Sequence, residues 1–242
     1  MAQERGWLLL TNDDGIEAVG LETLVKALHD EGFPVAVLAP SGNHSATGMR
    51  INLMKPMAYR PRDDLVERWG LNPHTTPVHL FELDGTPCDT MIVALDGGLN
   101  HLVPGVHPQM VVSGVNLGPN LSQDSYHSGT MGAAREAGLY GVPAIAASFT
   151  SFDPVGMERA VEATLDIVAA AAAVLPVKAG NLARPKGALE TTYFTTWPKP
   201  SADKPWRDHP ERALLNAFCN GDLMLNINAP ASWNGSWATT RL

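Results

Sequence analysis

Two adjacent carboxylates, Asp13 and Asp14, are the residues whose types and spacing point most directly to chemistry. Neighbouring carboxylates repel each other unless a cation or hydrogen bonds compensate for their charge. A hard divalent cation resolves this conflict, and oxygen ligands without a nearby cysteine cluster favour Mg²⁺, Mn²⁺ or Ca²⁺ over Zn²⁺. The alternative is that both side chains only serve the turn at Gly15, which is a common use of aspartate.

Three apolar runs of the sequence end in loops that are rich in small oxygen-bearing residues. The loops are Asn12–Gly15, Ser41–Ser45 and Ser113–Asn116. In open parallel sheets, ligands bind beyond the carboxyl ends of the strands. We therefore expect these three loops to meet.

A second polar group, Tyr126–Thr130, precedes a helix rich in small residues, Met131–Tyr140. Free amides, hydroxyls and the positive end of the helix dipole make such a start a ready anion site. We expect a phosphate to bind there, although ordinary N-capping by Ser128 or Thr130 accounts for the same residues. His127 is the one histidine that we consider for acid–base work, against the commoner solvated or structural role.

The elements that must position these residues alternate between strand and helix. Strands are expected from short buried apolar runs, and helices from apolar residues at helical spacing or from caps. The predicted strands are Trp7–Thr11, Val35–Ala39, His79–Leu83, Met110–Ser113 and Ala144–Ser148, and the predicted helices are Leu21–Leu28, Thr86–Leu95, Ser128–Tyr140 and Ala160–Leu175. This alternation predicts an α/β fold with a Rossmann-like, doubly wound, mostly parallel sheet.

The pattern is less regular elsewhere. Met49–Tyr59 is expected as an irregular strand, and strand-like runs at Leu189–Thr196 and Leu223–Asn228 flank a Pro- and Trp-rich segment. Runs of this kind suit half-exposed strands, so we predict a C-terminal antiparallel extension. We divide the chain into a metal- and phosphate-binding core, residues 1–150, and residues 151–242, which pack on the same domain and contribute to oligomerisation.

Composition and charge limit the class of protein. The formal net charge of −8, from 17 Lys and Arg against 25 Asp and Glu, argues against a broad nucleic-acid interface. No apolar run reaches the ~20 residues that a bilayer demands, and no secretion signal is visible. We therefore expect a cytoplasmic protein that binds neither nucleic acid nor membrane, with Cys88 and Cys219 as reduced, small buried side chains.

Four motifs, in the right order, resemble those of the SurE family of 5'/3'-nucleotidases. They are Thr11–Ile16, Ala39–Pro40 with Ser45–Gly48, Val112–Asn120, and His127–Thr130 with Ala133–Ala137. The segment Gly85–Pro87 resembles the same family. The similarity covers residues 8–148 almost continuously and resumes at residues 225–230.

The resemblance implies a specific site and activity. It implies one divalent cation per subunit, Mg²⁺ or Mn²⁺, and hydrolysis of nucleoside 5'- and 3'-monophosphates by a homodimer or higher homo-oligomer. The implied metal ligands are Asp13, Asp14, Ser45 and Asn116, the implied catalytic residues are Asp13, Asp14 and Asn116, and the implied phosphate-binding residues are Asn120, Ser128, Gly129 and Thr130. Family members continue beyond the equivalent of Leu242 into a tail that exchanges between subunits, so we expect an assembly no larger than a dimer.

Two mechanisms and two other protein classes are alternatives at this stage. Either a water molecule beside the cation attacks phosphorus, which we favour, or Asp13 or Asp14 forms a covalent intermediate. A signalling receiver domain also has two acidic residues after its first strand, but it needs an acceptor aspartate where this chain has Ser113–Asn116. The other class is a non-catalytic nucleotide or phosphate sensor that retains the metal site.

Overall fold

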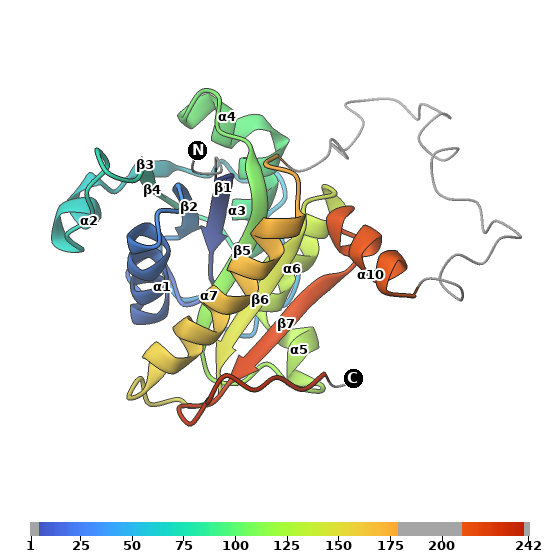
Figure 1. Cartoon of the computed structure of the whole chain (residues 1–242). Helices are drawn as coiled ribbons and strands as arrows, with labels where there is room; N and C mark the ends of the chain where they lie inside the picture. Colours follow the sequence, from blue (N-terminus) through green and yellow to red (C-terminus); the bar gives the residue numbers. More distant parts are fainter. Residues whose placement is uncertain (1–4, 179–209, 240–242) are drawn as a thin grey trace, which may run out of the picture.

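The computed structural model describes residues 5–178 and 210–239. The described residues form a seven-stranded sheet in the order β3-β4-β2-β1-β5-β6-β7, with helices on both faces (Figure 1). Every neighbouring pair is parallel except β3 and β4. This confirms the predicted α/β fold with a mostly parallel sheet.

The strands and helices expected in the first 150 residues are present, except that Met49–Tyr59 is not a strand and β5 is longer than Met110–Ser113. The strands are β1 (Trp7–Thr11), β2 (Val35–Pro40), β3 (Tyr59–Pro61), β4 (Val78–Leu83), β5 (Pro108–Leu117), β6 (Ala144–Phe149) and β7 (Met224–Ala229). The helices are α1 (Val19–Asp30), α2 (Asp63–Arg68), α3 (Pro87–Val93), η1 (Ala94–Gly98), α4 (Leu99–Leu102), α5 (Asp124–His127), α6 (Gly129–Leu139), α7 (Met157–Val174) and α10 (Pro210–Cys219).

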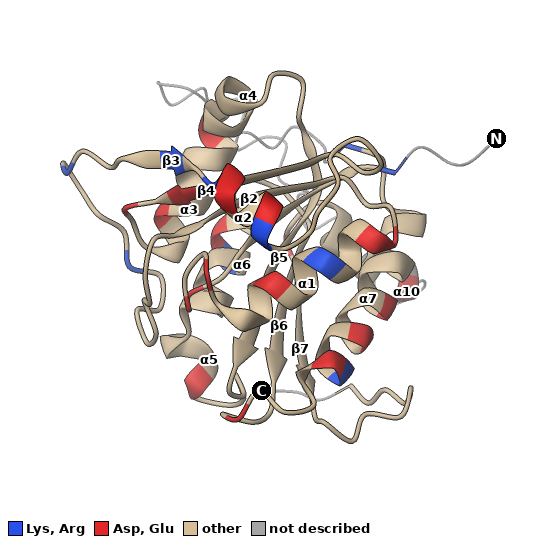
Figure 2. Ribbon diagram, turned by 90° about the vertical axis from the view of Figure 1, so that its left-hand side faces the viewer, with Lys and Arg blue, Asp and Glu red and all other residues tan. Residues whose placement is uncertain are grey.

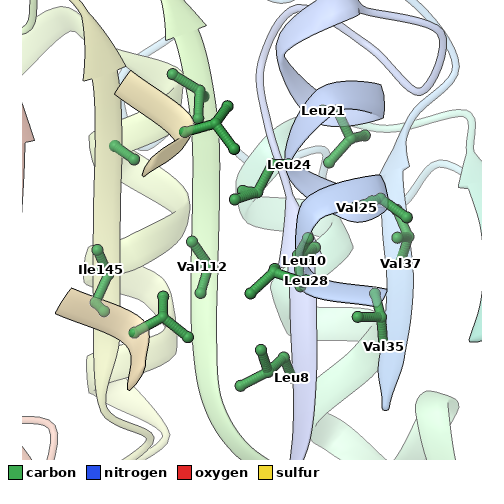
Figure 3. Packing of buried hydrophobic residues seen from close by; sticks show 14 of the residues in the cluster. Leu8, Leu10, Leu21, Leu24, Val25, Leu28, Val35, Val37, Val112 and Ile145 are labelled. Carbon is green, nitrogen blue, oxygen red and sulfur yellow. The ribbon is translucent and has the colours of Figure 1, made fainter. Parts of the chain in front are cut away.

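The core consists of two apolar layers, one on each face of the sheet. Successive strand residues point to opposite faces, so Leu8 and Leu10 join the cluster beneath α1 and α7, whereas Leu9 joins the cluster beneath α3 and α6. Figure 3 shows the first layer, in which leucine and valine side chains of α1 meet those of β1, β2 and β5. The strand ends that carry polar loops are thereby held in a rigid frame.

Two helix starts that were predicted from their caps are confirmed. Thr86 is the N-cap of α3 and forms a reciprocal capping box with Asp89, and Pro87 is the first helical residue. Ser128 is the N-cap of α6, where its hydroxyl oxygen accepts a hydrogen bond from the Met131 backbone N–H at 3.1 Å.

Two expectations about strands were wrong. The strand expected at Leu223–Asn228 is present as β7, but it pairs with β6 in parallel. Its polar–apolar alternation reflects a sheet edge with one partly open face, and this alternation says nothing about strand direction. Of Met49–Tyr59, only Tyr59 lies in a strand, and the short β3 is the antiparallel member of the sheet. The predicted strand at Leu189–Thr196 lies outside the described residues.

The described helices include none with the length and apolarity needed to cross a bilayer. The two cysteines are free, with Cys88 buried and Cys219 partly buried. Burial raises the pKa of the Cys88 thiol to about 12, with the nearby charges of Glu136 and Asp89 adding to the effect. Cys88 therefore stays protonated at neutral pH.

Candidate metal and phosphate site

The turn after β1 is built by Asn12 and not by the two aspartates. The Asn12 side chain donates to the Gly15 carbonyl at 2.9 Å and accepts from the Gly15 N–H at 3.2 Å. Helix α1 begins after Ala18, which supplies no side-chain cap. Asp13 and Asp14 therefore serve neither as the cap of α1 nor as the side chain that closes this turn, which weakens the purely structural interpretation of the pair.

Asp13 lies against the start of α6. The Thr130 hydroxyl donates to Asp13 Oδ1 at 2.6 Å, and Asp13 is only 3% exposed. Burial raises the pKa of Asp13, while the Thr130 hydroxyl and the backbone N–H groups at the start of α6 lower it; the net shift is upward. The acidic turn and the predicted phosphate loop are thus one site.

The close approach of these two segments depends on Gly129. A Cβ atom at this position would lie 2.7 Å from Asp13 Cβ and 3.0 Å from Thr47 Oγ1. Because real Cβ atoms do not approach backbone or buried side chains so closely, a larger residue here would push α6 away from β1. Glycine at this position lets the helix N-terminus reach the carboxylate.

Asp14 is the more accessible of the two carboxylates. Its Oδ2 accepts from the Leu117 backbone N–H and its Oδ1 from the Asn43 side-chain amide, both at 3.4 Å. Burial, and after it the charge of Asp13, raise the pKa of Asp14 to about 6, while the Leu117 N–H lowers it. Asp14 therefore links the ends of β1, β2 and β5.

The loop after β2 is held close to the acidic turn. The His44 N–H donates to the Asp13 carbonyl at 2.6 Å, and the Ser45 N–H donates to Asn43 Oδ1 at 2.9 Å. Ser45 is exposed, and it directly follows His44, which bonds to Asp13. The expected meeting of the loops after β1, β2 and β5 is found.

Asn116 lies at the end of β5, where the β5–β6 register shifts between Ser113 and Asn116. Its side-chain N–H donates to the Gly118 carbonyl at 2.7 Å. Because the amide nitrogen is used in this bond, the amide oxygen is the atom available to a cation. Asn116 precedes Leu117, whose N–H contacts Asp14, so it stands beside the acidic pair.

Asn120 belongs to a neighbouring amide cluster. Its side-chain N–H donates to Ser148 Oγ at 2.9 Å, and its backbone carbonyl accepts from the side chains of Asn226 at 2.9 Å and Asn228 at 3.2 Å. These bonds tie the loop after β5 to the ends of β6 and β7. Asn120 is therefore anchored on the β6 and β7 side of the acidic pair.

Sequence reasoning missed three supporting residues. Asn43 bonds to Asp14, and Asn226 and Asn228 hold Asn120. The last two carried a signal, because two asparagines at alternate positions of an otherwise apolar strand point to one face of it. Asn43 gave no separate signal, since its contact depends on how the loop folds back.

The acidic pair has no cationic side chain to balance it in the described part of the chain. None of the ion pairs there includes Asp13 or Asp14. The field around the site is not broadly positive either, since Lys and Arg are scattered over the ribbon shown in Figure 2 while acidic residues recur on α1, α5 and α7. An anion can bind here only if something local inverts the charge.

The donor set fits a hard divalent cation. Asp13 and Asp14 are carboxylates with raised pKa values, and the loops that carry Ser45 and Asn116 bond to them through the His44 and Leu117 N–H groups, so the nearby side chains offer oxygen donors. Among the described residues, no three His, Cys, Asp or Glu side chains gather in the manner of a zinc site. The residues suit Mg²⁺, Mn²⁺ or Ca²⁺ and do not suit a soft metal.

A separate charged pocket of about 350 Å³ lies beside these loops, with Ser41 and Glu17 on its wall. Arg62, which is buried, donates to Glu82 at 2.7 Å, to Glu17 at 2.6 Å and to both oxygens of Asp64. Its charge is therefore used within the protein. The pocket lies near the carboxyl ends of β2 and β4, and its Arg62 side chain does not balance the charge of the acidic pair.

Fold and site together define a class: an α/β protein in which a carboxylate pair meets a helix N-terminus at the carboxyl edge of a parallel sheet. Within this class the chain belongs to the SurE family, because residues 8–242 match the family model described as "Survival protein SurE".

Similar proteins agree with this assignment. The chain is 39% identical over 155 residues to "5'-nucleotidase SurE" of Desulfitobacterium hafniense, covering 64% of this chain and 55% of that protein. It is 36% identical over 161 residues to the protein of the same name from Synechococcus elongatus, covering 66% and 57%. The matched region therefore spans little more than half the length of these relatives.

A solved structure is also similar. The crystal structure of the SurE protein from Aquifex aeolicus shares 30% sequence identity and superposes with a TM-score of 0.57, covering 69% of this chain and 60% of that one. The likeness extends the family assignment from sequence to fold.

Proposed function

We propose that this chain is a divalent-metal-dependent phosphomonoesterase that hydrolyses nucleoside 5'- and 3'-monophosphates to nucleoside and phosphate. The observation that carries the proposal is the contact between Asp13 and the start of α6, which sets an unbalanced carboxylate pair against an anion-binding helix start. A phosphate monoester bridging a cation and that helix start would satisfy both parts. The names of the similar proteins, "5'-nucleotidase SurE", support the substrate class.

We assign the cation to four ligands: Asp13, Asp14, Ser45 and Asn116. One cation per subunit, Mg²⁺ or Mn²⁺, matches the all-oxygen set. When bound, it supplies the positive charge that the phosphate requires and lowers the pKa of a water molecule near phosphorus. We count Asp13, Asp14 and Asn116 as catalytic, because they would hold the charge that acts on the reacting phosphate.

The phosphate is assigned to Ser128, Gly129, Thr130 and Asn120. The Ser128 oxygen accepts from the Met131 N–H, which leaves the Ser128 proton free to donate to a phosphate oxygen. Thr130 differs, because it donates its one proton to Asp13. Backbone N–H groups at the start of α6 would stabilise the charge on the phosphate oxygens as phosphorus is attacked.

We favour attack by water over a covalent intermediate, because Asp13 is nearly buried and one of its oxygens already accepts from Thr130. Rapid-quench labelling with ³²P-phosphorylated nucleotide tests this choice. Protein-bound phosphate that forms and decays at the rate of turnover would overturn the water mechanism.

The proposed function itself is tested by phosphate release from a panel of 5'- and 3'-nucleoside monophosphates in the presence of Mn²⁺ or Mg²⁺. We expect turnover of several members of the panel, with a simple phosphate monoester as a reference substrate. Mn²⁺ and nucleotide binding without any turnover would instead identify a nucleotide sensor.

We also propose that the protein is a homo-oligomer to which residues 151–242 contribute. The family resemblance supports this, as does the exposure of Leu214 and Leu215 on α10. Light scattering coupled to size exclusion over a dilution series is the test, and a monomer at every concentration would contradict the proposal. The cytoplasmic location stays a prediction.

A further inference from the structure

The segment Gly48–Asn52 connects the loop of Ser45, the start of α6 and the N-terminus of α3, although none of its residues is among the proposed ligands. It lies shortly after Ser45 in the chain. The Gly48 N–H donates to the His127 carbonyl at 2.7 Å, immediately before the phosphate-binding start of α6. Its other end packs on the N-terminus of α3. The position of this segment therefore affects both the cation loop and the phosphate loop.

The backbone of Gly48 is trapped between two helices. A Cβ atom on Gly132 of α6 would lie 2.2 Å from the Gly48 carbonyl oxygen, so helix and loop are in direct backbone contact there. On the other side, the protonated Cys88 thiol of α3 lies 3.9 Å from the same oxygen. The start of the segment therefore contacts both α3 and α6.

Asp89 fastens the far end of the segment. Its Oδ1 accepts from the Asn52 backbone N–H at 2.9 Å, and its Oδ2 accepts from the Asn52 side chain at 2.7 Å and the Thr86 N–H at 2.8 Å. The Thr86 hydroxyl lies 2.6 Å from the Arg50 carbonyl. Asp89 is 1% exposed, so these hydrogen bonds are what compensate its buried carboxylate.

The capping box alone does not account for this arrangement. A cap needs only the bonds between Thr86 and Asp89, whereas Asp89 accepts two further bonds from Asn52, which is 37 residues away in the chain. The additional bonds fix a loop, and Met49–Tyr59 takes no part in the sheet except at Tyr59. The loop is therefore held by this carboxylate in place of a strand ladder.

From these contacts we propose that Asp89 is a positioning residue for the cation site: through Asn52 it fixes Gly48–Asn52, and that segment constrains the preceding loop, which carries Ser45 and bonds to Asp13 and Asp14 through His44 and Asn43. This inference rests on the proposed function, because it takes Ser45 as a ligand. Asp89 itself would touch neither cation nor substrate. Its effect would be on how well the ligands are preorganised.

The test uses Asn52, whose replacement leaves the cap of α3 intact. Asn52→Asp places a second carboxylate against Asp89 and should release the segment, while Asn52→Ala removes the side-chain bond alone. Asn100→Asp is the matched control: it adds the same charge at an exposed position of α4 and keeps its acceptor for the Gly105 N–H. Mn²⁺ binding to the metal-free protein is measured by calorimetry, well below the melting temperature of each variant.

We expect Asn52→Asp to weaken Mn²⁺ binding by about tenfold or more and Asn52→Ala by about threefold, in line with the loss of a supporting contact around a metal site. Asn100→Asp should bind as the wild type does. The direction of the change in Mn²⁺ affinity separates two explanations, because an added negative charge would by itself strengthen cation binding. Weaker binding by Asn52→Asp must therefore come from the displaced segment. A role restricted to folding would lower the melting temperature and leave the Mn²⁺ affinity unchanged.

Unchanged or tighter Mn²⁺ binding by Asn52→Asp would overturn the positioning role while leaving the proposed function intact. A wild-type protein that binds no Mn²⁺ at millimolar concentration would overturn both together. A further check is the double variant Asn52→Ala, Asp89→Asn: if the two residues act through one contact, its loss of affinity should be smaller than the combined losses of the single variants. Fully additive losses would contradict the shared contact.

Discussion

The two faces of the sheet are built differently, and the difference follows the location of the site. Beneath α1 and α7 the core contains bulky aliphatic side chains, such as Leu24 and Leu28 of α1, packed on β1, β2 and β5 (Figure 3). On the other face, α6 contributes small residues to the core, and its Ala133, Ala134 and Ala137 are all fully buried.

The small residues let α6 approach the sheet closely, and this approach brings its N-terminus to Asp13. Large side chains on the other face bury more apolar area and contribute more to stability. One sheet thus separates two tasks: the α1 face mainly stabilises the fold, and the α6 face mainly sets the geometry of the site. Changes on the two faces should therefore have different consequences.

The largest expected effect is that of Asp14→Asn, a change in the site itself. Removing one of two carboxylates should lower kcat/KM by roughly 10³-fold, because the cation loses a charged ligand and the phosphate loses its counter-charge. Phosphate release at saturating Mn²⁺ measures this loss. Activity near that of the wild type would reduce Asp14 to a turn residue.

The same variant should stabilise the metal-free protein, and only at the higher pH. The folded pKa of Asp14 is about 6 against an ordinary value of 3.8, so the folded state binds more protons than the unfolded state between these values. The stability of the metal-free wild type should therefore fall as pH rises through this window. An uncharged amide in place of the carboxylate would avoid that loss, so thermal unfolding should show the variant melting a few °C higher at pH 7 and no higher at pH 4.

Gly129→Ala should have the next largest effect. The new methyl group would lie 2.7 Å from Asp13 Cβ, and displacing α6 by a fraction of an ångström should reduce kcat by about 10²-fold. Gly138→Ala is the control on the same helix, since its methyl group would meet the Gly221 carbonyl at 2.6 Å, at the opposite end of α6. That control should melt lower and keep its activity; equal losses in both variants would remove the special role of the helix start.

A smaller effect is expected of Thr130→Val, which keeps the shape of the side chain and deletes its hydroxyl. Asp13 loses a hydrogen bond that lowers its pKa, so its pKa should rise further and protons should compete more strongly with the cation at lower pH. We expect kcat/KM to fall by about tenfold, with Mn²⁺ affinity falling more at pH 6. A loss that does not depend on pH would show that the hydroxyl acts on phosphate alone.

Leu28→Ala, on the opposite face, should have the smallest effect on activity. Leu28 is fully buried, and its truncation should cost about 2–5 kcal/mol of stability. At a temperature where the variant is still folded, kcat and KM should stay within about twofold of the wild-type values, since the site lies on the other face. Thermal unfolding measures the loss of stability, and steady-state kinetics measures kcat and KM. A loss of kcat as large as that of Gly129→Ala would show that the two faces do not have separate roles.

The parts of this fold that could be predicted from sequence are those in which local pattern and burial agree. Leu21, Leu24, Val25 and Leu28 repeat at helical spacing and all lie in one core layer, and Thr86 with Asp89 forms the cap that its spacing indicates. The direction of β7 could not be predicted, because alternation reports exposure and does not report the neighbour. The strand predicted at Met49–Tyr59 was wrong, because this segment is held by the hydrogen bond between Asn52 and Asp89, which lies 37 residues away and leaves no local pattern.

The candidate site shows the same limit. Asp13, Asp14 and the start of α6 could be selected from residue types, but no local pattern showed that the Thr130 hydroxyl bonds to Asp13. Metal and phosphate residues that appeared as two groups in the sequence share a hydrogen bond in the structure. Contacts of this kind depend on the packing of α6 on β1 and are absent from any short stretch of sequence.

We propose that the acidic turn and the start of α6 form one cation-dependent phosphatase site. The most direct test is phosphate release from a nucleoside monophosphate by the wild-type chain before chelation, after exhaustive chelation, and after Mn²⁺ or Mg²⁺ is returned. We predict release that disappears with the chelator and recovers with the cation, and no recovery for Asp14→Asn. Undiminished release from the fully chelated protein would contradict the account.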